Sequence, residues 1–541
     1  MGAPLAPPRR LVQRGAPMPS SLSLNPVAEV RPEQLAAGKR ALVMDAAWAS
    51  ATGALSGGVV LLAYALLLGA APMQIGLLAA IPFMAQAAQL PAIVVVERIR
   101  ERKRFGVASL TVARLMMLTM AALPYVVPPQ HRLWLLILAN LAISVLGAMA
   151  SCAINSWFHQ LLPAEGLGAF FSKRLFVASI VGCICILSAG VLVDHPPGGD
   201  ALNAYAVIFS AAALAGLASS YCLASTPEPA MAPARRRASL RSLLRMPLQD
   251  RGFRGLLVLL AAWNLATNFA APFLAVYLLE QLHYSLSTVT TLWVTSQLSN
   301  ALTLYLWGPV SDRLSNRAVL AVALPAYFLC TIGLVFTGLA DTAVQLVLLY
   351  LVHAVMGAAS GGIALATGNL SLKLAPREHG TAYLAATGVV SSIAGGLAPI
   401  AGGAMAQWFA SAQLAVVIRW TSVSGSNEFS VASFAHWEFL FGISAVLGLY
   451  AIHAVSRVRE GGDYSERVVI QELALEALRT VNQLSSIGGA VGGMFAFDRL
   501  ARALLRRRPR KTRRNRIRQL LLAPYVFRRR RARRAASHAR P

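Results

Sequence analysis

The chain has 541 residues, of which 13% are charged and 56% are hydrophobic, and its mean hydropathy is +0.58. Ordinary soluble domains carry about 25% charged residues, so the composition excludes a soluble globular protein. The formal net charge is nevertheless +27, which means that the charged residues present are mostly basic.

The first forty residues contain arginines and prolines but no separate apolar core and no small-residue cleavage site before Ala41. We therefore expect no cleavable signal peptide, and we expect segment 1–40 to lie on the cytoplasmic side. Apolar stretches follow, such as 133–154 and 343–367, and each has about the 20 residues that a helix needs to cross a bilayer. They predict helices, because the strands of a membrane barrel would alternate polar and apolar residues.

Hydropathy predicts six spans before a polar, Arg-rich linker at 226–254 and six spans after it. The spans lie near 41–69, 75–96, 105–127, 133–156, 175–193, 203–225, 255–279, 287–308, 319–338, 343–367, 383–408 and 437–456. The predicted fold is an all-α membrane protein with two six-helix bundles, 41–225 and 255–456, and a C-terminal tail, 457–541. Lys and Arg collect in the loops of one side, which predicts that this side and both termini are cytoplasmic, in the inner membrane. The loop at 411–434 on the other side is unusually long.

The two halves repeat each other, which is expected of several transporter folds. The fourth and fifth spans, and the tenth and eleventh, are joined by segments in which Pro, Glu, Gly and an aromatic residue recur in the same order. These residues are Pro163, Glu165, Gly168 and Phe171 in the first half, and Pro376, Glu378, Gly380 and Tyr383 in the second.

The loop after the eighth span carries a motif, Gly308, Asp312, Arg313 and Arg317. In this motif the chain resembles the major facilitator superfamily, whose signature here is Gly-x-x-x-Asp-Arg-x-Gly followed by two basic residues. Ser315 and Asn316 depart from that signature. The first-half copy is weaker, because it lacks both glycines and has Glu97 and Arg98 in place of Asp-Arg.

The resemblance implies twelve helices that move a small solute by alternating access, with these loops as cytoplasmic latches. A carboxylate at a helix end can pair with an Arg or with the positive end of a neighbouring helix, so Asp312 and Arg313, and Glu97 and Arg98, are candidates for that role. The alternative is that these residues are only the positive-inside charges of ordinary loops.

Polar groups at membrane depth are expensive and commonly functional. The resemblance implies that the first, fourth, seventh and tenth spans line the central cavity, and the polar or aromatic candidates there are Asp45, Trp48, Asn140, Trp263, Asn264, Asn268 and His353. Asn264 and Asn268 share one helix face and are the preferred substrate contacts. The alternative is that the asparagines only join helices by hydrogen bonds. Gln297, Asn300 and Arg114 are predicted to be structural, with Arg114 close enough to reach headgroups by snorkelling.

Asp45 is a candidate proton carrier, but a gate or a helix-end partner is an equally good interpretation because Arg40 lies nearby in sequence. His353 could titrate near neutral pH, although a lone His in an apolar helix is more often packed and hydrogen-bonded. Five cysteines lie in apolar stretches, where they predict no disulfide framework. Cys183 and Cys185 have the wrong spacing for a zinc knuckle, so no metal or other cofactor is expected.

The tail begins with an amphipathic pattern at 465–484 and becomes Arg-rich from Arg499 onward. Such a run beside a membrane favours contact with anionic headgroups, while a solvated tail is the alternative and nucleic-acid binding is disfavoured. The predicted function is secondary transport of an unidentified small solute, with H⁺ as one possible coupling ion. No Walker motif predicts ATP hydrolysis, and no catalytic constellation predicts an enzyme. A transport-inactive membrane sensor or scaffold is the alternative function.

Overall fold

The computed structural model describes residues 25–27, 30–163, 167–231, 240–376, 380–422, 425–458, 460 and 468–476. The first group of helices is α1 (Pro32–Ser56), α2 (Gly58–Leu67), α3 (Pro72–Ala85), α4 (Gln89–Ile99), α5 (Arg102–Val126), α6 (Pro129–Leu161), α7 (Leu167–Asp194) and α8 (Ala201–Ala224). The second group is α9 (Leu240–Gln249), α10 (Arg251–Val276) with the π-helical turn Tyr277–Gln281, α11 (Leu286–Arg313), α12 (Asn316–Thr337), α13 (Thr342–Leu374), α14 (Gly380–Trp408) and α15 (Trp437–Ala454).

Eleven helical segments of the described residues are long and apolar enough to cross a membrane, and these include α1 and α2 as one segment. The two are separated by a kink at Gly57 and Gly58, where Gly58 has a φ of 52°, a value that favours glycine. The helix α11 has 28 residues and is therefore also long enough to cross a membrane. It is not among the eleven, because its Ser, Thr, Gln and Asn residues lower its hydropathy. The prediction of a helical, multi-pass membrane protein is confirmed.

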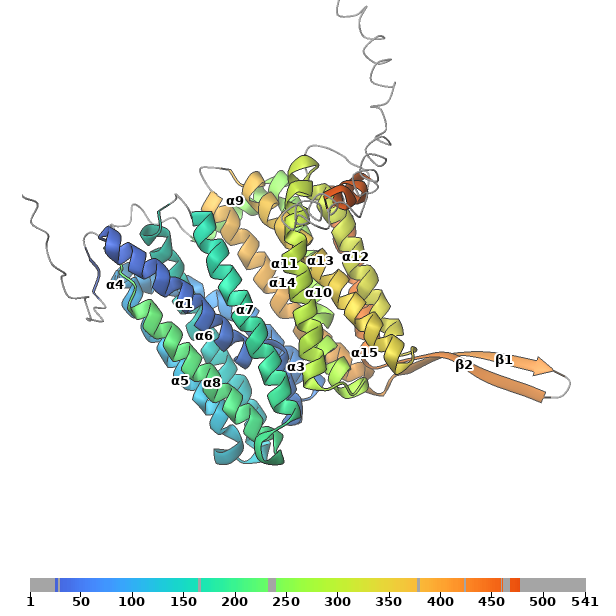
Figure 1. The fold of residues 1–541 in the computed structure, drawn as a ribbon. Coiled ribbons are helices and arrows are strands. Elements are labelled where there is room, and N and C mark those ends of the chain that lie inside the picture. The colour runs from blue at the N-terminus through green and yellow to red at the C-terminus, as the bar shows by residue number, and fades with distance from the viewer. Residues whose placement is uncertain are drawn as a thin grey trace, which may run out of the picture.

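The helices form two bundles that lie side by side (Figure 1). In the N-terminal bundle, α1 to α8, α1 packs on α7 and α8, and α5 packs on α6 and α8. In the C-terminal bundle, α10 to α15, α10 packs on α14 and α15, and α12 packs on α13 and α15. We call the end where α1 begins and α15 ends the termini side, and the opposite end the hairpin side. The bundles contact each other mainly through α3 with α14 and α7 with α11.

The hydrophobic cores show where the bundles join. One core cluster contains residues of both bundles, including Tyr64 and Phe209 of the first and Phe273 and Phe441 of the second. These residues lie toward the hairpin side. Toward the termini side each bundle has its own cluster, around Trp157 in the N-terminal bundle and around the helices α10 and α12 in the C-terminal bundle. Among the described residues, the bundles therefore share a core on the hairpin side and have separate cores on the termini side.

The long loop predicted at 411–434 is an antiparallel hairpin, β1 (Gln413–Ser422) and β2 (Gly425–Ala435), in which Leu414 pairs with Phe434. It projects away from the C-terminal bundle (Figure 1). On the termini side, residues 468–476 form a short helix that packs Val469 into the C-terminal core. This helix lies within the predicted amphipathic segment 465–484, whereas the Arg-rich part of the tail lies outside the described residues.

Candidate functional site

Asp45 lies at the centre of a polar cluster in the N-terminal bundle. It is only 3% exposed, and its carboxylate lies 2.9 Å from Nη2 of Arg174 on α7. Ser219 of α8 donates a hydrogen bond of 2.7 Å to the other carboxylate oxygen. Asp45 therefore joins α1 to α7 and α8, all within one bundle.

Arg114 of α5 lies beside this cluster and interacts electrostatically with Asp45. Its side chain packs on Gly216 of α8, where a Cβ atom would overlap the Arg114 side chain. The buried Nε atom of Arg114 has no hydrogen-bond partner among the described residues. The structure thus places the side chain of Arg114 against α8. The sequence instead predicted that this side chain lies within reach of the lipid headgroups by snorkelling.

The remaining candidates of the N-terminal bundle are not part of this cluster of contacts. Trp48 of α1 is 40% exposed. Asn140 of α6 is buried, and its side-chain nitrogen has no partner within the described part of the chain. An unpartnered amide in an apolar helix is costly, so Asn140 stays a candidate for contact with a ligand or water.

Asn264 and Asn268 lie on α10 and are both half-buried. Each donates its side-chain N–H to a carbonyl one turn earlier in its own helix, Asn264 to Leu260 at 2.9 Å and Asn268 to Asn264 at 2.9 Å. Within the described residues neither side chain is hydrogen-bonded to another helix, so their side-chain oxygens remain available as acceptors.

Trp263 and His353 are packed inside the C-terminal bundle. The ring of Trp263 makes edge contacts with two rings of α12, with distances between ring centroids of 4.9 Å to Tyr327 and 5.8 Å to Phe328. His353 of α13 is buried, and its Nδ1 lies 2.8 Å from the carbonyl oxygen of Leu349 in the same helix. In the part of the chain that the structure describes, no hydrogen bond joins either of these side chains to Asn264 or Asn268.

Glycines allow the two bundles to touch through their backbones at the α3–α14 contact. A Cβ atom at Gly76 of α3 would overlap the carbonyl oxygen of Pro399 on α14, and one at Gly403 would lie 2.7 Å from the carbonyl oxygen of Pro72. Gly403 belongs to a glycine-rich run in the eleventh predicted span, and small residues of this kind permit close helix packing. The structure shows that packing directly.

The α7–α11 contact also joins the two bundles. Asp194, the last residue of α7, accepts hydrogen bonds from the backbone N–H of Leu286 at 3.0 Å and of Ser287 at 2.9 Å. These two residues begin α11. One turn earlier on α7, Gly190 lies so close to α11 that a Cβ atom would be 2.8 Å from Cα of Ser287.

On the termini side, the start of α5 is held by the segment that follows α8. Glu228 forms a buried ion pair of 3.1 Å with Arg102, and its two oxygens also accept the backbone N–H of Arg102 and Lys103 at 2.9 and 3.1 Å. Arg102 additionally donates to the carbonyl oxygen of Pro229 at 2.7 Å. This contact fastens α8 to α5.

A matching contact holds the start of α12 in the C-terminal bundle. Glu460, which follows α15, accepts the backbone N–H of Arg317 at 2.8 Å and the side-chain N–H of Asn316 at 2.7 Å. Its first oxygen also lies 3.2 Å from Nζ of Lys373. In each bundle a glutamate after the last helix therefore caps the start of another helix, α5 in the first bundle and α12 in the second. The start is the positive end of the helix dipole.

The predicted latch residues lie in the helix ends next to the loops, in α4, in α11 and at the start of α12. Arg313 pairs with Glu472 at 3.0 Å and with Glu476 at 2.7 Å, both on the helix 468–476. Asp312 is exposed and makes no hydrogen bond or ion pair within the part of the chain that the structure describes. A Cβ atom added at Gly308 would meet no atom of the described residues within 4 Å, so that surface of α11 is open. Glu97 is half-buried and Arg98 is exposed.

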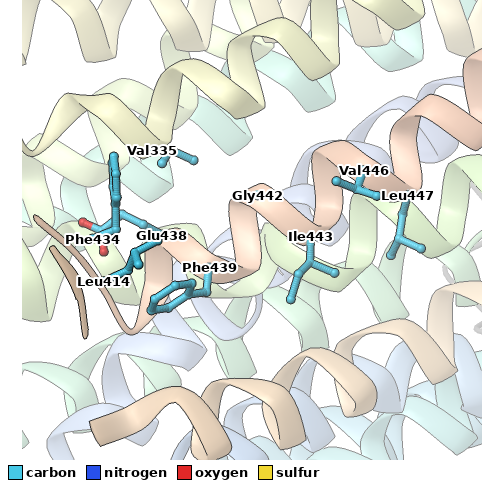
Figure 2. Close-up of a pocket in the computed structure, with 9 residues that line it drawn as sticks. All are labelled: Val335, Leu414, Phe434, Glu438, Phe439, Gly442, Ile443, Val446 and Leu447. Carbon is cyan, nitrogen blue, oxygen red and sulfur yellow. The ribbon is translucent and has the colours of Figure 1, made fainter. Parts of the chain in front are cut away.

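A hollow of about 450 Å³ lies where the hairpin meets α15. Figure 2 shows Leu414 and Phe434 of the hairpin beside Phe439, Ile443 and other residues of α15, with Val335 of α12 opposite. Val446 of this lining is 65% exposed. The hollow is nearly all apolar and lies on the flank of the C-terminal bundle, away from the α3–α14 and α7–α11 contacts.

Sequence reasoning missed Glu228, Glu460 and Asp194, each of which accepts two or more hydrogen bonds at the start of a helix. A signal was available for the first two, because an acidic residue follows the last span of each half. For Asp194 the signal was its spacing from Gly190, which matches the spacing from Gly308 to Asp312.

Two multi-helix bundles joined at one end are the arrangement found in several transporter folds. A family model for the Major Facilitator Superfamily matches residues 46–399, more than half of the chain. The chain belongs to the Major Facilitator Superfamily, as the loop motif predicted. No curated protein matches the chain.

Solved structures share the fold at low sequence identity. A mutant of the nucleoside transporter NupG is 15% identical, covers 78% of this chain and 100% of its own, and has a TM-score of 0.59. A bacterial homologue of the iron transporter ferroportin in an inward-facing state is 13% identical, with 78% and 98% coverage and a TM-score of 0.57. The D-xylose-proton symporter is 13% identical, with 77% and 95% coverage and a TM-score of 0.56.

Proposed function

We propose that this protein is a secondary active transporter with twelve spans, α11 being the eighth, that carries a small solute by alternating access between its bundles. The observation that carries the proposal is the distribution of the cores. The bundles share a core on the hairpin side and have separate cores on the termini side. Two bundles that are closed at one end and parted at the other have the form expected of one end state of a rocking carrier.

We further propose that the termini side faces the cytoplasm, with the protein in the inner membrane. Its helix ends carry basic residues such as Arg98, Arg104 and Lys173, whereas the helix ends and short loops of the hairpin side carry Asp194, Asp200 and Glu280. This distribution follows the positive-inside rule. In that orientation the side with separate cores faces the cytoplasm, as expected of an inward-facing state.

For the substrate, we propose contacts on α10 with the side-chain oxygens of Asn264 and Asn268, and with Asn140 and Trp48 from the N-terminal bundle. Hydrogen-bond acceptors without a charge suit a polar solute that donates hydrogen bonds. The structural relatives named above are a nucleoside transporter, a homologue of an iron transporter and a D-xylose-proton symporter. A first panel therefore contains nucleosides, sugars and divalent metals, followed by amino acids, organic acids and amphipathic drugs.

The test is the thermal stability of the purified protein in detergent against this panel. A ligand that binds only the folded protein raises the apparent melting temperature. We expect a shift with one class of compound that is lost in Asn264→Ala. The matched control is Asn155→Ala, which removes an exposed asparagine at the termini-side end of α6 and should keep the shift. A shift that survives in Asn264→Ala would contradict the proposed site on α10.

The Arg-rich tail lies outside the described residues, and we propose that it contacts anionic headgroups. A peptide of residues 477–541 should then sediment with vesicles that contain anionic lipid and much less with neutral vesicles, because clustered arginines are attracted to a negative surface. A version of the peptide with each Arg replaced by Gln is the control and should lose this binding. Equal binding of both peptides to the anionic vesicles would contradict the proposal.

A further inference from the structure

Two helices from different bundles carry the same short pattern at opposite ends. The helix α7 ends on the hairpin side with Gly190 and, four positions later, Asp194. The helix α11 ends on the termini side with Gly308 and, four positions later, Asp312. The two helices pack against each other and run in opposite directions, so each carries its Gly-x-x-x-Asp pattern where the other helix begins.

At the hairpin side the contact is made. Each oxygen of Asp194 accepts one backbone N–H from the first turn of α11, those of Leu286 and Ser287. The first amides of a helix have no partner inside the helix and lie at its positive end, so a carboxylate is well suited to them. The missing side chain of Gly190 allows the two backbones to come this close.

At the termini side the corresponding contact is absent from the described residues. Asp312 is exposed and unpaired there. Large apolar side chains on the termini-side portions of both helices are also exposed, Leu175 and Phe176 at 65% and 67% on α7 and Leu302 and Tyr305 at 68% and 75% on α11. The helices therefore touch at one end and are uncovered toward the other.

We propose that Gly190 and Asp194 form a latch that holds the hairpin side closed, and that this side opens only when Asp194 leaves the amides of Leu286 and Ser287. This inference rests on the proposed alternation between two states. It assigns Asp194 as a positioning residue for transport, acting between the bundles and not on the substrate. In this proposal the two helices exchange roles between the two ends. On the hairpin side α7 provides the carboxylate and α11 the backbone amides, and on the termini side α11 provides the carboxylate and α7 the amides.

The latch can be tested without knowing the substrate. Spin labels on a variant without the native cysteines would report distances across the hairpin side, with Val126→Cys and Leu339→Cys, and across the termini side, with Ile99→Cys and Leu372→Cys. All four positions are exposed. In lipid nanodiscs, Asp194→Ala should increase the hairpin-open population at least tenfold, because the loss of even one hydrogen bond to a charged group is worth about a factor of ten. The hairpin-side distance should lengthen and the termini-side distance should shorten.

Two further variants separate the possible failures. Asp200→Ala removes a carboxylate on the same side that caps α8 inside the N-terminal bundle, through the N–H of Leu202 at 2.9 Å, and it should leave both distances unchanged. Gly76→Val forces α3 and α14 apart on the hairpin side without touching Asp194. If Gly76→Val shifts the distances and Asp194→Ala does not, the latch is wrong and alternation stands. If neither variant shifts them, both the latch and the proposed alternation are contradicted.

Discussion

Glu228 and Arg102 form an ion pair of 3.1 Å in which the side chains are 0% and 2% exposed. Glu228 comes from the segment after α8, and Arg102 is the first residue of α5. The same carboxylate accepts two backbone N–H groups at the start of α5. Three donors on one buried carboxylate leave little of its hydrogen-bonding capacity unused, so its removal should expose an uncompensated charge.

We expect Glu228→Ala to lower the free energy of unfolding by about 3–5 kcal/mol, the range for breaking a buried ion pair by removing one partner. Thermal or chemical unfolding of purified protein measures this. Glu460→Ala is the matched change in the C-terminal bundle, where the glutamate is 13% exposed and its partner Lys373 is 55% exposed. Glu460→Ala should lower the free energy of unfolding by clearly less than Glu228→Ala does. An equal loss would show that burial of the glutamate does not determine the size of the effect.

Asp45 and Arg174 should be energetically coupled. Asp45→Ala leaves the half-buried Arg174 without its carboxylate, and Arg174→Ala leaves Asp45 without its cation. The two single changes should therefore each destabilise the protein, and the double variant should lose less than their sum by about 0.5–3 kcal/mol. Lys173→Ala, an exposed neighbour of Arg174, is the control. Strict additivity would mean that the ion pair contributes nothing, and would leave Asp45 free for another role such as proton binding.

Gly216→Ala should destabilise the N-terminal bundle by about 1–3 kcal/mol, because the new methyl group would overlap the side chain of Arg114 in a packed interior. Gly147→Ala is the matched control on α6, where no atom of the described residues lies within 4 Å of the added Cβ. There the better helix propensity of alanine should give a neutral or slightly favourable change. Unfolding of both variants under the same conditions measures the difference between their free energies of unfolding. This difference would vanish if the side chain of Arg114 can turn away from the added methyl group.

The helix 468–476 should detach when its contacts are weakened. An isolated helix of this length is unstable in water, so it depends on buried Val469 and on the pairs of Arg313 with Glu472 and Glu476. Val469→Ala should therefore speed amide hydrogen exchange throughout the segment. Ile470→Ala changes a residue that is 54% exposed and should leave the exchange unchanged. Equal protection in both variants would show that the helix is not held by its buried face.

The membrane helices were predictable because a helix in lipid must be long and apolar. The span predicted at 203–225 is α8 at Ala201–Ala224, and the one predicted at 287–308 lies within α11. The loop at 411–434 was recognised only as long and polar. Its pairing into β1 and β2 depends on cross-strand contacts on either side of a short turn, which hydropathy does not report.

The candidate site was less predictable, because hydropathy identifies helices but not their neighbours. Asp45 stood out in sequence as a carboxylate within a span, yet its partner Arg174 lies on a helix more than a hundred residues away. Asp194 accepts the N–H of Leu286, which lies 92 residues later in the chain. Trp263 is adjacent to Asn264 in sequence, but the helix turns its ring toward α12.

The hairpin offers a practical route to imaging this protein. A transporter embedded in a detergent micelle or nanodisc has few features outside it by which particle images can be aligned. The strands β1 and β2 extend away from the helices (Figure 1), so a small rigid domain inserted between them, or an antibody fragment raised against the hairpin, would add mass without entering the contacts between the bundles. The same handle would mark one side of the membrane in every image, so that orientation and conformation could be read from one data set.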